Sequence, residues 1–147
     1  MRDFRKLTVW NAAHGLVLEI YGVCAKFPRD ERFILAAQLQ RAAISIPSNI
    51  AEGVGRFSDA EFRRHVEFAT GSSKEVEYQI LLAKDLGYVS ERDYANLVEK
   101  LDRVQRLLRG LHKALAKSSR ATFRAIATES EQLIPEGQKP KAKSEKP

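Results

Sequence analysis

Apolar residues recur along most of the chain at the spacing of amphipathic helices. Stretches at about residues 9–27, 31–55, 58–86 and 90–115 repeat apolar side chains at i, i+3 and i+4. None sustains the alternation of a half-buried strand, and no Asn-Gly or Asp-Gly pair marks a hairpin. Helices of this length joined by short turns pack as antiparallel neighbours. The pattern therefore predicts an all-α fold, an antiparallel up-down four-helix bundle formed by residues 1–117 as one domain.

Capping residues mark three of the predicted helix ends. Ser58 and Glu61 have the spacing of a capping box, in which the serine hydroxyl accepts a hydrogen bond from the Glu61 amide. Ser90 starts the fourth helix in the same way, with Asp93 in the acidic position. Gly87 is a natural C-terminal cap of the third helix, because glycine adopts the left-handed conformation readily.

Two prolines shape the first half of the chain. Pro28 disfavours helix at the residue before it, so the first helix is expected to end near Phe27. The second helix is expected to begin at about Glu31, and Pro47 lies inside it. A proline there removes one backbone hydrogen bond and crowds the carbonyl of Ala43, so the sequence predicts a kinked second helix.

The last thirty residues form a C-terminal tail, residues 118–147. Up to about residue 133 the tail has the composition to extend the fourth helix. Beyond Pro135 it contains almost no apolar residues, and such a composition predicts disorder.

The overall composition is that of a single globular domain. A chain of 147 residues with 44% apolar residues can bury a core without disulfides or metal. Its one cysteine, Cys24, cannot form an intramolecular disulfide and fits a reducing compartment. The start of the chain lacks the apolar core of a signal peptide, and no stretch is long and apolar enough to span a membrane. We therefore expect a soluble, cytoplasmic protein without membrane contact.

The residues that carry enzyme chemistry are sparse. The three histidines have no zinc-binding spacing, and Cys24 lies on an apolar stripe, where a free cysteine behaves as a small hydrophobic residue. No glycine-rich phosphate loop is present, since Gly53-Val-Gly55 lacks the third glycine and the lysine. The sequence predicts no catalytic residues, no metal, no cofactor and no enzymatic activity.

The strongest constellation is a row of cations on the fourth helix. The net charge of the chain is +6, and no Asp or Glu interrupts residues 103–117. At about 100° per residue the cations lie opposite the leucine stripe, where such a row can follow a phosphate backbone. The alternative is the solvated face of an ordinary amphipathic helix. The predicted nucleic-acid-binding row consists of Arg103, Arg106, Arg109, Lys113 and Lys117, extended by Arg120 and Arg124 if the helix continues.

Aromatic residues divide into two groups. Tyr88, Tyr94 and Phe123 are the candidates for stacking on single-stranded bases. The residues expected in the core are Trp10, Phe27, Phe33 and Phe62.

A second polar cluster surrounds the proline of the second helix and faces the third. Contacts between arginines and glutamates of these two helices would form a packing network or a subunit interface. A catalytic pair would instead need two carboxylates with separated pKa values in a cleft. The cluster consists of Arg41, Asn49, Glu52, Arg56 and Glu75.

Several motifs together are similar to those of a known family. They are FRKLTVW at 4–10, Phe27-Pro28, QLQRAAISIPSNIAEG at 38–53, Arg56, Ser58, Glu61-Phe62, ATGSSKE at 69–75 and LGY at 86–88. Over about residues 4–115 the chain resembles the four-helix-bundle proteins encoded in intervening sequences of bacterial 23S ribosomal RNA genes. Two features depart from the family: Gln40 replaces a usual basic residue, and the tail is longer.

The resemblance implies a four-helix protomer that assembles into a ring-shaped homopentamer and binds RNA. Related small bundles are accessory proteins of diversity-generating retroelements, where they contact a reverse transcriptase and its RNA. The resemblance carries over no catalytic residue. Two hypotheses follow: a non-enzymatic oligomer that binds RNA or another nucleic acid through basic surfaces, or a protein-interaction accessory subunit of a reverse transcriptase.

Overall fold

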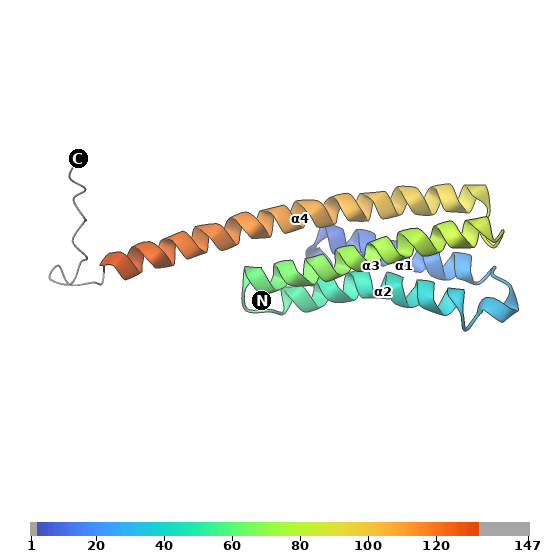
Figure 1. Cartoon of the computed structure of the whole chain (residues 1–147), viewed down its shortest axis with the longest axis horizontal. Coiled ribbons are helices and arrows are strands. Elements are labelled where there is room, and N and C mark those ends of the chain that lie inside the picture. The colour runs from blue at the N-terminus through green and yellow to red at the C-terminus, as the bar shows by residue number, and fades with distance from the viewer. Residues whose placement is uncertain (1–2, 133–147) are drawn as a thin grey trace, which may run out of the picture.

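The computed structural model describes residues 3–132, except for the side chains of residues 122, 123 and 126–132. This part of the chain contains helices and no strand. The disorder predicted beyond Pro135 lies outside the described residues. The elements, shown in Figure 1, are two short 3-10 helices, η1 (Phe4–Lys6) and η2 (Arg29–Glu31), and four α-helices, α1 (Thr8–Cys24), α2 (Leu35–Val54), α3 (Asp59–Asp85) and α4 (Glu91–Gln132).

The four α-helices form a closed square. Both α1 and α3 pack against α2 and α4, and consecutive helices run in opposite directions (Figure 1). This arrangement confirms the all-α, up-down four-helix bundle. The inward faces of all four helices meet in one core, whose largest fully buried side chains are Leu16, Ile20, Leu39, Ile46, Ile50, Val66, Val76, Ile80, Leu97, Val104 and Leu108.

The predicted caps of α3 and α4 are confirmed. The Ser58 hydroxyl accepts from the Glu61 amide at 3.2 Å, and the Ser90 hydroxyl accepts from the Asp93 amide at 3.1 Å. Gly87 has φ +78°, and the amides of Gly87 and the next residue bond back to the last turn of α3. These bonds satisfy carbonyls that would otherwise lack partners, so the chain turns sharply into α4.

The turn between α1 and α2 is longer than the sequence predicted. Helix α1 ends at Cys24, and Phe27 is buried outside the helix. Helix α2 begins at Leu35, whose amide donates to the Glu31 carboxylate at 3.2 Å. The same carboxylate accepts a hydrogen bond from the Tyr88 hydroxyl at 3.1 Å. Glu31 therefore caps the second helix from outside it, and a contact distant in sequence fixes that position.

Pro47 does not interrupt α2. It is buried, and the helix is continuous from Leu35 to Val54 around it. The second helix is thus unbroken, and its kink stays a prediction.

Helix α4 is much longer than the bundle. The Ser118 hydroxyl bonds to the Asp59 carboxylate at the start of α3, so at this position α4 reaches the end of its neighbour. The helix passes the boundary predicted at residue 117 without a break and continues to Gln132. At 1.5 Å per residue the part beyond Ser118 extends about 21 Å. Figure 1 shows this part projecting past the other three helices.

We expect Cys24 to resist alkylation. Burial raises the pKa of its thiol from 9.0 to about 11, and the thiolate is the reactive form. At about pH 8 iodoacetamide should modify the folded protein about 100-fold more slowly than the unfolded chain, because two pKa units remove that fraction of thiolate. Mass spectrometry of timed samples, with and without urea, measures both rates. Equal rates would show that the thiol is not protected.

Candidate nucleic-acid interface

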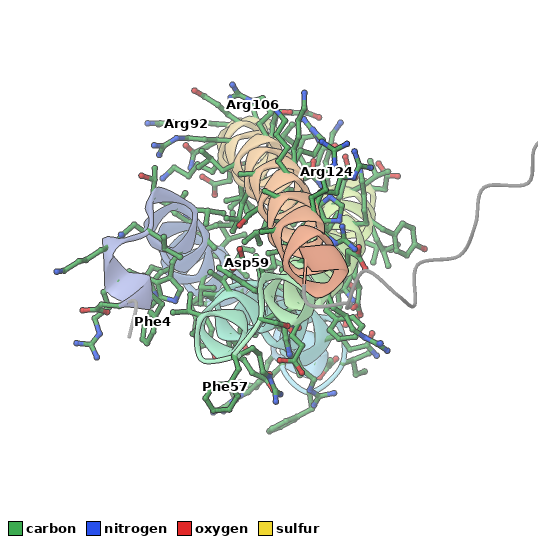
Figure 2. The ribbon with its side chains drawn as sticks, turned by 90° about the vertical axis from the view of Figure 1, so that its left-hand side faces the viewer. Phe4, Phe57, Asp59, Arg92, Arg106 and Arg124 are labelled. Atoms are coloured by element: carbon green, nitrogen blue, oxygen red, sulfur yellow. The ribbon has the colours of Figure 1, made fainter. Side chains whose placement is uncertain are left out.

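The seven predicted cations of α4 are all exposed, from Arg103 to Arg124. They lie opposite the apolar stripe of the same helix, which anchors α4 in the core through Leu97, Leu101, Val104, Leu108 and Leu115. The burial of this stripe forces the cations outward. Figure 2 shows Arg106 pointing away from the other three helices.

Few carboxylates neutralise this row. Arg106 pairs with Asp102 at 3.0 Å, and both side chains are more than half exposed. Such a pair contributes little stability and competes weakly with another anion. Among the described residues no carboxylate lies within 4.0 Å of the cationic groups of Arg103, Arg109, Lys113, Lys117 or Arg120. The row is therefore available to a polyanion.

The row runs along the bundle and onto the projecting part of α4. From Arg103 to Arg124 the helix rises about 32 Å at 1.5 Å per residue. Neighbouring cations are three or four residues apart, which is about 4.5–6 Å along the axis. Duplex DNA carries one phosphate charge per about 1.7 Å of its axis, so a row of this length faces many phosphates.

The two tyrosines predicted as stacking residues are engaged within the bundle. Tyr88 packs on Phe27 with ring centroids 5.7 Å apart, and Tyr94 lies under the ammonium of Lys84 at 4.6 Å. The side chain of Phe123 lies outside the described residues. Both tyrosine rings thus have contacts within the protein, and base stacking stays a prediction.

The polar cluster between α2 and α3 is organised by a histidine. The His65 ring accepts from the Arg56 guanidinium at 3.2 Å through Nε2, because a guanidinium can only donate. Its Nδ1 therefore carries the proton and donates to Asn49 Oδ1 at 3.3 Å. Asn49 donates in turn to the Ser45 carbonyl at 2.8 Å, and Arg56 also pairs with Glu52 at 2.8 Å. Three of the five predicted residues thus join one network through His65.

The remaining two residues of the predicted cluster do not pair. Arg41 and Glu75 line one shallow hollow of about 280 Å³ between α2 and α3, without an ion pair. Glu75 instead accepts from the Gln79 amide at 3.2 Å. Among the described residues of the single chain no arginine–glutamate pair links α2 to α3. The subunit-interface alternative for this cluster stays a prediction. The helices are linked through His65, and through the Ser45 and Ser72 hydroxyls at 2.8 Å.

Gly53 lets the end of α2 approach α3 closely. A Cβ atom at this position would lie 2.5 Å from a ring carbon of Phe62 and 2.9 Å from Cβ of His65. Only glycine fits here. The end of α2 at Gly53 therefore packs directly against Phe62 and His65 of α3.

His65 is the residue that the sequence analysis missed. No local sequence pattern shows that Asn49 and Arg56 lie beside it. The other two histidines are also engaged: His14 stacks on Trp10 with ring centroids 4.9 Å apart, and His112 lies 2.9 Å from Glu67.

Two further findings concern only the described part of the chain. It contains no group of three or more histidine, cysteine, aspartate or glutamate residues that could hold a metal ion. It also contains no helix that combines the length and the apolar character needed to cross a membrane.

Comparisons with known proteins agree with this architecture. No curated protein matches the chain. A solved structure from Bacteroides thetaiotaomicron, described as a protein with unknown function from the S23 ribosomal protein family, superposes with a TM-score of 0.67 at 21% identity. The match covers 72% of this chain and 99% of the other, and it shows a shared fold. The family model of the 23S rRNA-intervening sequence protein matches residues 5–110. The chain therefore belongs to the 23S rRNA-intervening sequence protein family.

Proposed function

We propose that this protein is a non-enzymatic, cytoplasmic homo-oligomer, a pentamer by its resemblance, that binds RNA or another nucleic acid through the basic row of α4. The observation that carries the proposal is the exposed row itself, with five cations that no described carboxylate neutralises. A rigid helix holds them in line, so little ordering is needed on binding. Cations that contact phosphates fix a protein on nucleic acid without reading its sequence.

The proposal predicts a steep dependence of binding on salt. Each phosphate contact releases counterions, so log K falls as log salt rises. Replacement of Arg103, Arg106, Arg109 and Lys113 by glutamine should make this negative slope shallower by about three to four. Affinity for a structured RNA at low salt should fall at least about tenfold. Filter binding or fluorescence anisotropy at several salt concentrations measures both quantities.

A charge-matched variant separates local contacts from net charge. Replacement of the exposed Lys6, Lys26, Arg64 and Lys74 by glutamine removes the same charge from outside α4. This variant should keep most of the wild-type slope. Equal slopes for the two variants would exclude α4 as the binding surface and leave the protein-adaptor function as the alternative. Circular dichroism verifies that both variants keep their helical content.

A further inference from the structure

Charge is distributed very unevenly over the four helices. Helices α1 and α2 contain one and two charged residues, whereas α3 contains ten and α4 fifteen. The charged side chains of α1 and α2 lie at their seams with the other helices. Glu19 of α1 pairs with Lys100 of α4, Arg41 of α2 faces α3, and Glu52 belongs to the network around His65. Along the two helices the outer face shared by α1 and α2 therefore carries no charged side chain, and Arg29 and Arg32 of the turn flank it at the end near Phe33.

This face exposes large apolar side chains. Leu18 is 62% exposed, Ile44 40%, and Phe33, which the sequence placed in the core, 83%. From Phe33, on the turn before α2, the outward stripe continues at helical spacing along α2 through Ala37, Gln40, Ile44, Ser48 and Ala51. Several large apolar side chains exposed on one face are typical of interaction sites.

Two hollows lie along the same groove between α1 and α2. One, of about 670 Å³, includes Tyr21 and Phe33 near the turn between the helices. The other, of about 360 Å³, includes Trp10 and Ile44 and lies toward the opposite end. The face therefore offers both projecting apolar side chains and hollows to receive them, as a surface that packs against another protein does.

We propose that another copy of this chain packs against the uncharged outer face of α1 and α2. This inference rests on the homo-oligomer of the proposed function and assigns its contact surface. Like charges that approach each other oppose association, so in a chain of net charge +6 a face without charged side chains is one that a second copy can approach at low electrostatic cost. The basic row of α4 then remains outside the contact, as Figure 2 shows for Arg106 relative to Phe4 beside α1.

The size of the face suits such a contact. Helix α2 has 20 residues and a length of about 30 Å, and two helices side by side are about 20 Å wide. The face therefore covers about 600 Å² per copy, and burial on both partners gives about 1,200 Å², the lower limit of stable specific interfaces.

The test compares two charge insertions of equal exposure. Ile44 on α2 and Val98 on α4 are both β-branched and both 40% exposed. Native mass spectrometry and sedimentation of nuclease-treated protein should show an assembly for the wild-type chain and for Val98→Arg. Ile44→Arg should dissociate to monomers with unchanged helical content.

A second pair of variants keeps the test decisive if one variant of the first pair misfolds. Leu18 on α1 and Tyr78 on α3 are both 62% exposed, so Leu18→Lys should dissociate the assembly and Tyr78→Lys should not. A monomeric wild-type protein, or an assembly that survives both Ile44→Arg and Leu18→Lys, would overturn the inference. The mass of RNA-free protein tests this contact, and RNA affinity tests the α4 row, so either proposal can fail without the other.

Discussion

Replacement of Leu108 by alanine is expected to lower the free energy of unfolding by about 2–5 kcal/mol. The side chain is fully buried in the middle of the α4 stripe, where the helix meets the core. Truncation removes buried apolar surface and leaves a cavity that the packed neighbours can fill only in part. Urea denaturation followed by circular dichroism measures the loss, at one fixed protein concentration because assembly contributes to stability.

The adjacent Arg109 supplies the control. It is exposed to solvent on the cationic side of the same helix, so Arg109→Ala should change stability by no more than about 0.5 kcal/mol. Similar losses for the two variants would mean that α4 does not separate a packing face from a cationic face, and the proposed binding surface would lose its basis.

Gly53→Ala should destabilise the protein by about 1–3 kcal/mol. In an ordinary helix position alanine is better than glycine by about 1 kcal/mol. Here the added methyl group would overlap the Phe62 ring, which is itself buried, and the backbone-linked Cβ of His65. The end of α2 must therefore move away from α3, which disturbs the network around His65. Thermal or urea unfolding measures the change.

Gly71 is the matched site for this substitution. It lies within α3, and a Cβ built there meets nothing within 4 Å. Gly71→Ala should therefore stabilise the protein by about 0.5–1 kcal/mol through helix propensity alone. A gain at Gly53 similar to that at Gly71 would show that the close approach of α2 and α3 is not required.

Local signals explain what the sequence predicted well. The capping serines Ser58 and Ser90 bond to amides three residues away, and Gly87 needs only its own backbone freedom. These interactions are complete within one turn, so their spacing identifies them. The apolar stripes also repeat at a fixed local spacing, so periodicity predicted the four helices, and the short turns between them predicted their antiparallel order.

Long-range contacts explain what the sequence did not reveal. The start of α2 depends on Glu31, which Tyr88 holds from the other side of the bundle. The role of His65 depends on two residues of another helix and turn. Phe33 has the hydrophobicity of a core residue but lies on the long turn before α2, where no helix covers it. None of these relations has a fixed sequence spacing.

The same contrast between local and long-range contacts applies to the candidate site. The cationic row belongs to one helix, so its residues and their outward direction were predictable from sequence. The network of Arg56, Asn49 and Glu52 joins two helices, so only its composition was predictable. Its partners and its proton positions required the structure.

The continuity of α4 gives the outer cations a fixed rotational phase relative to the bundle. One residue inserted between Lys117 and Arg120 would rotate Arg120 and Arg124 by about 100° about the helix axis and take them out of line with the inner cations. Seven inserted residues would return them to within about 20° and move them about 10 Å outward. The chain in this segment can therefore vary in length by whole heptads far more easily than by single residues, if the row acts as a unit.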